Sequence, residues 1–451
     1  MKMGKNNILD TTSCLIMRQA ISFLAACAMS GSAMAAVSYS YEDDGKTYVA
    51  NVTSAETAIS DEAITVLDAN EITNFAVRGS AALHVNKGTS YAGDVRATTD
   101  LRLSAENSLG VGPGKIYVKE HFIHMTGATV SKDVSFDCGT GWGNNTGVKL
   151  SYRSTSAFKG KVTFTDRNFI LCPYVDSRLV FEGGLEGSGG IQVREATGGT
   201  VVFTNMPLRL SNAYPISIQS VGSLEPNQFY YYHFIFAVAG NQLAQFMHSS
   251  YRFQKGELKT TVDWAFDNSS QIMYFANDCK WDLCGTSQRV GYLNFTCPSG
   301  NASVITNSFA APATLYVTQT ANATPAAIFG GNLSVDFSGN KITTIDYANT
   351  AKGGITVNAG TLAFTENGSW ANATNVTVKG SAKITIANAN AFRGKADVNL
   401  AANSSLEIAS GLTVNVRTLT IGGVQQPRGD YTFGSGTLHV SRPCGFILCV
   451  H

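Results

Sequence analysis

Carboxylates are the side chains of this sequence that the cleavage of a polysaccharide would require. Glycosidases place two of them about 5–10 Å apart, on either side of the bond that breaks. The acidic residues closest together in the sequence form three pairs, Asp43/Asp44, Asp61/Glu62 and Glu182/Glu186. None of these pairs occupies matched positions of the sequence repeat described below, where stacking would bring two carboxylates together. We therefore predict no catalytic residue and no cofactor site.

An aromatic run from Phe229 to Phe234 is the other feature that suits sugar chemistry. Its rings could form a platform on which sugars stack, or they could be the buried side of an ordinary strand, which we favour. The platform would make the section 211–290 the site of a polysaccharide lyase or glycoside hydrolase, the alternative function for this chain. Its lining would be Tyr230, Tyr232, Trp264, Asp263 and the basic Lys259.

Histidines and cysteines could bind a metal ion, but their spacing does not favour it. The nearest two of the seven histidines, His121 and His124, are three residues apart, which places them on opposite faces of a strand. Cys279, Cys284 and Cys297 have no histidine nearby to complete a four-ligand zinc site. We predict no metal site.

Four cysteines have a spacing that suits small disulfide loops. Seven cysteines lie beyond the leader segment described below, and an odd number leaves at least one thiol outside any intramolecular disulfide. The candidate pairs, each separated by four residues, are Cys279/Cys284 and Cys444/Cys449. Disulfides form in exported proteins. Buried thiols are the alternative for the same residues.

The element that must position these side chains is a short strand repeated at a fixed period. Five apolar pairs recur at steps of 22, 21, 22 and 21 residues: Leu333/Val335, Ile355/Val357, Val376/Val378, Val398/Leu400 and Leu419/Ile421. A second row recurs at steps of 22: Leu362/Phe364, Ile384/Ile386 and Leu406/Ile408. Apolar residues two apart share one face of a strand, and a period of this length indicates stacked repeats. We predict an all-β fold, a right-handed parallel β-helix with coils of about 22 residues.

The first 35 residues have the pattern of a secretory signal peptide. Basic residues precede a short apolar run, and Ala33-Met34-Ala35 gives a small-x-small cleavage site between Ala35 and Ala36. We expect no transmembrane segment in the mature chain. The predicted organisation is a leader over 1–35, a β-solenoid over 36–330 with an irregular aromatic section at 211–290, regular repeats over 331–440, and a cysteine-containing tail over 441–451.

Composition limits the partners of the chain. Of the 451 residues only 14% are charged, and the formal net charge is +1. Nucleic-acid binding depends on a surplus of basic residues, so we expect no nucleic-acid partner. Glycans or other surface proteins are the expected partners.

Four segments of the second half carry a resemblance to a known family. They are residues 281–291 (WDLCGTSQRVG), 304–308 (VITNS), 313–317 (ATLYV) and 353–364 (GGITVNAGTLAF). These segments resemble the bacterial autotransporter-associated β-strand repeat proteins, in which D-L-N-G-x-x-Q-T-V-G precedes I-T-N-S, A-T-L-T-V and G-G-L-T-V-N-A-G-T-L. Cys284 stands where that family more often has Asn, and Arg289 where it often has Thr. Residues 419–431 also resemble the ends of such repeat regions.

The resemblance implies a passenger-like protein, one without the C-terminal membrane barrel of a complete autotransporter, since only 11 residues follow Val440. We expect an exported, non-enzymatic solenoid that acts as a structural or adhesive protein. Its expected place is the cell surface, the outer membrane or the extracellular space, with the periplasm as the other compartment.

Overall fold

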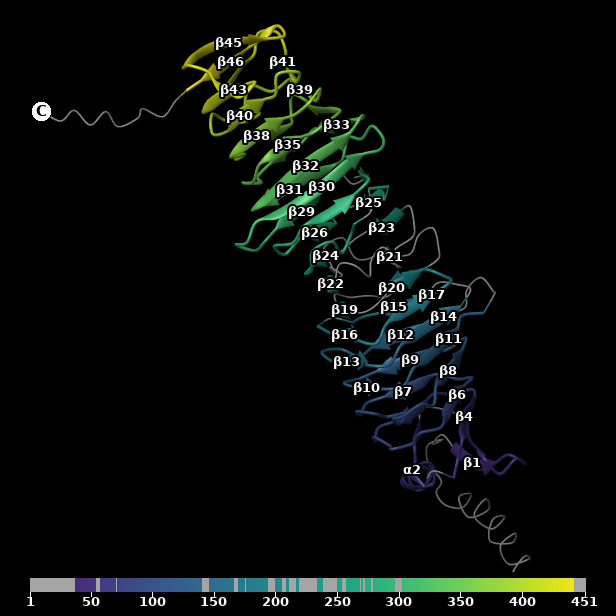
Figure 1. The fold of residues 1–451 in the computed structure, drawn as a ribbon. Coiled ribbons are helices and arrows are strands. Elements are labelled where there is room, and N and C mark those ends of the chain that lie inside the picture. Colours follow the sequence, from purple (N-terminus) through teal and green to yellow (C-terminus); the bar gives the residue numbers. More distant parts are fainter. Residues whose placement is uncertain are drawn as a thin grey trace, which may run out of the picture. The chain divides into compact units, whose positions relative to one another are not determined.

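The computed structural model shows a parallel β-solenoid, with 53% of the residues in strands and 2% in helices. Coils of about 22 residues lay their strands on the equivalent strands of the coil before (Figure 1). The fold predicted from the sequence period is thus confirmed. The structure describes residues 37–53, 57–69, 71–139, 146–165, 169–174, 176–193, 199–204, 208–210, 216–218, 233–237, 250–253, 257–267, 269–270, 272–276, 279–296 and 302–441.

Several predicted features lie outside these ranges. They are the leader with Ala35 and Ala36, the tail with Cys444 and Cys449, and the aromatic pair Tyr230 and Tyr232. The section 211–290 is described only in part. Within the described ranges, no helix has the length and apolar character needed to cross a bilayer.

Two compact units divide the chain, Met1–Lys149 with Ser156–Thr163, and Leu150–Thr155 with Phe164–His451. In the first unit, one row of strands is β1 Val37–Tyr41, β2 Thr47–Val52, β4 Asn74–Gly79, β6 Asp94–Ala97, β8 Ile116–Lys119 and β11 Val134–Asp137. A second row is β3 Thr57–Ala58, β5 Leu83–Val85, β7 Leu101–Leu103, β9 Phe122–Met125 and β12 Gly147–Leu150. A third pairs β10 Thr129–Val130 with β13 Thr155–Phe158, and β14 Val162–Thr165 lies at the boundary of the units.

The second unit continues the same design. Its rows begin with β15 Phe169–Cys172, β18 Ile191–Val193, β21 Ile216–Ile218, β23 Ser250–Phe253, β25 Ile272–Ala276 and β28 Tyr292–Thr296. Another row is β16 Arg178–Phe181, β19 Thr200–Thr204, β22 His233–Ala237, β24 Glu257–Thr260, β26 Lys280–Asp282, β29 Ser303–Asn307 and β31 Ala327–Gly331. A short row pairs β17 Leu185–Gly187 with β20 Leu208–Leu210.

The last part of the second unit holds the regular repeats. One row is β27 Gln288–Val290, β30 Ala313–Gln319, β32 Leu333–Gly339, β35 Ile355–Val357, β38 Asn375–Val378, β40 Asp397–Leu400, β43 Thr418–Ile421 and β44 Val424–Gln425. A second row is β33 Ile342–Ile345, β36 Thr361–Phe364, β39 Lys383–Ile386 and β41 Ser405–Ile408. A third row pairs β34 Ala348–Asn349 with β37 Ser369–Trp370. The last row is β42 Thr413–Val416, β46 Gly436–Val440 and β45 Gly429–Phe433.

The predicted inward rows are confirmed with one exception. Ile384 pairs with Leu362 and with Leu406, as the period of 22 requires. Ile355, however, pairs with Val335 and not with Leu333, so the first step of the other row is 20 residues. Strand β32 has seven residues and several buried apolar side chains. Since each of these side chains satisfies the same alternation, the sequence pattern alone does not fix which one is paired.

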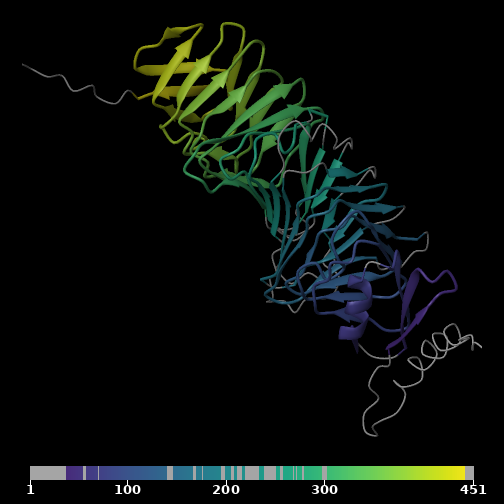
Figure 2. The ribbon, with the colours of Figure 1, turned by 60° about the horizontal axis from the view of Figure 1, so that its bottom comes forward.

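Within the described residues, antiparallel strands cover the edge strands at three places. Strand β1 pairs antiparallel with β2, β44 with β43, and β45 with β46. Figure 2 shows β1 and the helix α2, Asp61–Asp68, at the same end of the first unit. The hydroxyl of Ser60 caps this helix by accepting the Ala63 N–H at 3.1 Å. Such pairing leaves fewer open strand edges for another chain to join.

Candidate functional site

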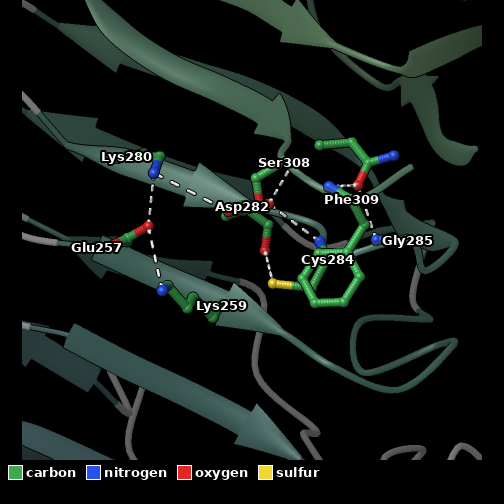
Figure 3. Close-up of polar contacts among 9 residues, drawn as sticks. Glu257, Lys259, Lys280, Asp282, Cys284, Gly285, Ser308 and Phe309 are labelled. Carbon is green, nitrogen blue, oxygen red and sulfur yellow. Dashed lines mark hydrogen bonds and ion pairs between the residues drawn. The ribbon is translucent and has the colours of Figure 1, made fainter. Parts of the chain in front are cut away.

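Strands β24 and β26 bring together four charged side chains whose proximity the sequence pattern did not predict. Leu258 and Trp281 point into the core and are buried. Because side chains alternate along a strand, the flanking residues point to the other face. In the register of the two strands, Glu257 lies opposite Lys280, and Lys259 lies opposite Asp282. Figure 3 shows Glu257 between the two lysines, with Lys280 also close to Asp282 of its own strand.

The four charges alternate in sign. Lys280 Nζ lies 2.7 Å from Glu257 Oε1 and 3.9 Å from Asp282 Oδ2, and Lys259 Nζ lies 3.8 Å from Glu257 Oε1. Burial alone would lower the pKa of Lys280, but its hydrogen bond to Glu257 and the attraction of both carboxylates raise it. The side chains of Glu257 and Asp282 are only 7% and 3% exposed. The four charges sum to zero, and the contact between Lys280 and Glu257 links two successive coils.

Asp282 has a second task in the turn that follows β26. Its Oδ1 accepts the backbone N–H of Cys284 at 3.1 Å and that of Ser308, one coil further, at 3.0 Å. A general acid in a glycosidase needs a carboxyl group that reaches the substrate and holds a proton near neutral pH. Asp282 is buried, its Oδ1 already accepts two backbone N–H groups, and its Oδ2 lies 3.9 Å from Lys280 Nζ, so this carboxylate is placed to join coils.

The turn itself explains the residue at position 284. Thr286 donates its backbone N–H to the Leu283 carbonyl at 2.9 Å, and the two central residues, Cys284 and Gly285, have φ values of 47° and 82°. Positive φ at both positions is typical of a type I′ turn. Among residues other than glycine, Asn adopts this region most readily. This preference accounts for the Asn that the resembling repeat proteins more often carry here.

The predicted disulfide between Cys279 and Cys284 does not form. The Cys284 thiol is free and lies 3.6 Å from the Asp282 carbonyl oxygen. Burial, reinforced by the charge of Asp282, raises the pKa of this thiol to about 12. The strand Lys280–Asp282 separates the two cysteines, and three extended residues span about 10 Å. A disulfide needs Cα atoms within about 7 Å, so the spacing of four residues misled the prediction.

We expect Cys284→Asn to keep or raise the stability of the protein, because Asn tolerates positive φ. Cys284→Val should lower the free energy of unfolding by about 1–2 kcal/mol, since a β-branched residue is strained in the left-handed region. Thermal unfolding of the two variants beside the parent chain measures the difference. Equal melting temperatures for both variants would contradict the importance of the backbone conformation.

The other residues of the sequence-derived enzyme hypothesis are engaged elsewhere. Lys259 faces Glu257. Asp263 accepts the Ser287 N–H at 2.6 Å and is exposed. The Trp264 ring lies 5.1 Å from the Arg289 guanidinium and 5.4 Å from the ring of Tyr316. No contact joins these residues into a pair of carboxylates with a basic partner among the residues that the structure describes.

The three acidic pairs of the sequence are likewise used in local structure. Asp44 Oδ1 accepts the N–H groups of Lys46 and Thr47, both at 2.8 Å. Asp61 and Glu62 occupy the first turn of α2, where the helix dipole favours negative charge. Glu186 lies in β17, opposite Arg209 of β20.

One cavity of about 290 Å³ opens on the second unit. It is lined mainly by apolar and small polar residues of β36, β39 and β41, among them Phe364, Thr385 and Glu407. Glu407 is its charged side chain, and this carboxylate pairs with Lys383 at 2.6 Å. The cavity thus offers one neutralised carboxylate and not the pair that a glycosidase uses.

In the first unit, His121 and His124 reach the same carboxylate, against the prediction that they lie on opposite faces. His121 Nδ1 is 3.1 Å from Asp100 Oδ1, and His124 Nε2 is 3.2 Å from Asp100 Oδ2. His121 precedes strand β9, so the alternation of a strand does not apply to it. Within the described part of the chain, no set of three or more His, Cys, Asp or Glu side chains is placed to hold a metal ion.

Burial alone would raise the pKa of Asp100, but hydrogen bonds from His124, the Phe122 N–H and His121 lower it to about 2. A lowered pKa stabilises the fold above the unfolded value of about 4, and this contribution is lost as the pH falls towards 2. The side chain is 35% exposed, so solvent screening reduces the contribution to about 1 kcal/mol.

We therefore expect Asp100→Asn to lower the free energy of unfolding by about 1 kcal/mol at neutral pH. The difference from the parent chain should shrink between pH 4 and pH 2, where the parent loses the carboxylate. Urea titrations at a series of pH values measure it, with Asp43→Asn, at an exposed position, as control. A difference that stays constant with pH would contradict the assignment.

No protein-family model matches this chain, and neither the curated proteins nor the solved structures contain a significant match.

Proposed function

We propose that this chain is an exported, non-enzymatic β-solenoid that acts as a structural or adhesive protein at the cell surface or in the extracellular space. The observation that carries the proposal is the use of Asp282. This carboxylate, in the most distinctive sequence segment, accepts backbone N–H groups from two coils and lies beside Lys280. This carboxylate, which could have served in catalysis, instead joins successive coils.

The resemblance to the autotransporter-associated repeat proteins supports a passenger-like role. Its segments 281–291 and 304–308 contain Asp282 and Asn307, and both side chains hydrogen-bond across neighbouring coils. Side chains that join successive coils in this way support a structural role for the repeats. The pattern of a leader over residues 1–35 supports export.

Protease shaving of intact cells, followed with an antibody against the mature chain, tests the location. Loss of the full-length signal, while a periplasmic marker stays protected, is the result that we expect for a surface protein. Protection of the chain together with the marker would place it in the periplasm and overturn the surface role.

Incubation of the purified chain with a panel of acidic and neutral polysaccharides tests the alternative, a polysaccharide lyase or glycoside hydrolase. We expect no new reducing ends and no unsaturated products. Cleavage that disappears in Glu257→Gln or Asp282→Asn, while both variants remain folded, would replace our proposal with the enzymatic one.

A further inference from the structure

Two aromatic rings and an arginine lie together on the outward face of the second unit. Arg289 of β27 pairs in register with Tyr316 of β30, and the residues that flank each of them along its strand are buried. Because side chains alternate along a strand, Arg289 and Tyr316 point outward. The Trp264 ring lies 5.4 Å from the ring of Tyr316 and 5.1 Å from the Arg289 guanidinium. We call Trp264, Arg289 and Tyr316 the outer aromatic cluster.

Trp264 is held in this position against its backbone preference. Its backbone N–H donates to the Ser287 carbonyl at 2.7 Å, which places the turn beside β27, and its φ is 58°. A bulky residue rarely adopts positive φ, since its Cβ approaches the backbone in the left-handed region. The indole is only half-buried, so it gains less from burial than the core residue Trp281 does. Residues held in such conformations cluster at ligand sites, and this one brings a ring to the surface.

The polar groups beside the cluster offer both donors and acceptors of hydrogen bonds. Arg289 Nη1 lies 2.8 Å from Asp267 Oδ1, and the two side chains are 42% and 40% exposed. Asp336 of β32 pairs in register with Tyr316, and its carboxylate accepts a hydrogen bond from the Asn358 side chain. With Arg289 paired to Asp267, the cluster has no surplus of positive charge to attract a polyanion. Rings bordered by charged groups of both signs suit a neutral ligand that carries many hydroxyl groups.

We propose that the outer aromatic cluster binds a neutral β-linked glucan, an inference that rests on the adhesive role proposed above and names its ligand. All hydroxyl groups of a β-linked glucose ring are equatorial, so both faces of the ring present only C–H groups. Such an apolar face packs on the rings of tryptophan and tyrosine. The hydroxyl groups at the edge of the sugar then accept from the Arg289 N–H groups and donate to the carboxylates of Asp267 and Asp336.

The positions next to the cluster continue as a polar column along the stack. Asp336 pairs in register with Thr356, and Thr356 with Thr377, both half-buried (β30, β32, β35 and β38 are labelled in Figure 1). Neighbouring strands lie about 4.8 Å apart, a spacing close to the length of one sugar unit in a linear β-glucan. The glucan therefore lies along the coils, with one sugar on the rings and the next ones over the threonine hydroxyls. Several weak contacts along one chain add up, so a longer chain binds more tightly than a disaccharide.

Calorimetry of the purified mature chain with cellohexaose, cellobiose and the acidic polygalacturonate tests the proposal. We expect cellohexaose to bind, cellobiose to bind more weakly and polygalacturonate not to bind. Trp264→Ala and Tyr316→Ala should each weaken the binding of cellohexaose about tenfold, the effect of 1.4 kcal/mol. Trp264→Phe, which keeps a ring at this position, should retain most of the affinity. Thermal unfolding of each variant shows that a loss of binding does not come from a loss of the fold.

Tyr152→Ala is the matched control. Tyr152 is exposed, and the Arg153 guanidinium lies 4.7 Å from the centre of its ring, so the variant removes an arginine–tyrosine contact at another place on the surface. It should leave the affinity unaltered. Equal weakening by Tyr152→Ala, or equal binding of polygalacturonate, would overturn the proposal in favour of unspecific adsorption. Absence of binding to cellohexaose, or binding that Trp264→Ala and Tyr316→Ala leave unchanged, would also overturn it. Protease shaving tests the surface location separately, because a surface protein can fail to bind a glucan and a periplasmic one can bind it.

Discussion

Replacing Trp281 by alanine should lower the free energy of unfolding by about 4 kcal/mol, the largest effect that we expect from a single substitution. The Trp281 side chain is fully buried. Its ring stacks near Phe275, with the centroids 6.2 Å apart, and meets the edge of Phe266 at 5.6 Å. Its Nε1 donates to Thr260 Oγ1 at 3.3 Å. Removing the ring leaves a cavity in the middle of the stack and takes one hydrogen bond from the Thr260 hydroxyl.

Trp264→Ala is the matched control. Trp264 is half-buried and contacts Arg289 and Tyr316 on the outer side of the solenoid. Losing a cation–π contact at such a site costs about 1 kcal/mol. Denaturant titrations give the two free energies, and hydrogen exchange of β24–β29 tests whether the loss is local, since long repeat arrays need not unfold in one step. Equal costs for the two tryptophans would contradict the buried role of Trp281.

The repeat pattern predicted the rows of strands because burial acts on every coil in the same way. Leu362, Ile384 and Leu406 are all buried and lie in register. The exception at Ile355 arose where a long strand offers more than one buried partner. The periodicity thus predicted which face of each strand points inward. Which residue of β32 pairs with Ile355 depends on the lengths of the turns, which the pattern does not encode.

The outward-facing groups were harder to predict. The pairing of Glu257 with Lys280 was missed because the two residues lie 23 positions apart on irregular coils, and one fixed period of 22 does not align them. His121 was misplaced because strand alternation was applied to a residue that precedes its strand. Sequence-derived alternation is reliable inside a strand and fails at its ends.

Asn307 should be the second most sensitive position, and its role explains the segment that most clearly marked this chain as a repeat protein. Its Oδ1 accepts the N–H groups of Gly285 at 2.8 Å and Phe309 at 3.1 Å. Its Nδ2 donates to the carbonyls of Ala311 at 2.6 Å and Asn332 at 2.8 Å. One buried amide therefore joins its own turn to the coils on both sides.

Asn307→Ala should lower the free energy of unfolding by about 3 kcal/mol, since four hydrogen bonds are lost at about 1 kcal/mol each and solvent recovers part of them. Asn332→Ala is the control, because this more exposed amide donates to Ala310 at 2.9 Å; the loss should stay below about 1 kcal/mol. Denaturant titration of both variants measures the difference.

Asn307→Asp separates the hydrogen-bonding role from mere filling of space. The substitution keeps the size of the side chain but places a carboxylate against the carbonyls of Ala311 and Asn332, which accept hydrogen bonds from the native amide. Burial and these dipoles should raise the pKa of the new carboxyl group in the folded state. A raised pKa means that protonation favours folding, so the variant should recover stability as the pH falls from 7 towards 5. A loss of stability that does not change with pH would show that the amide acts through its shape alone.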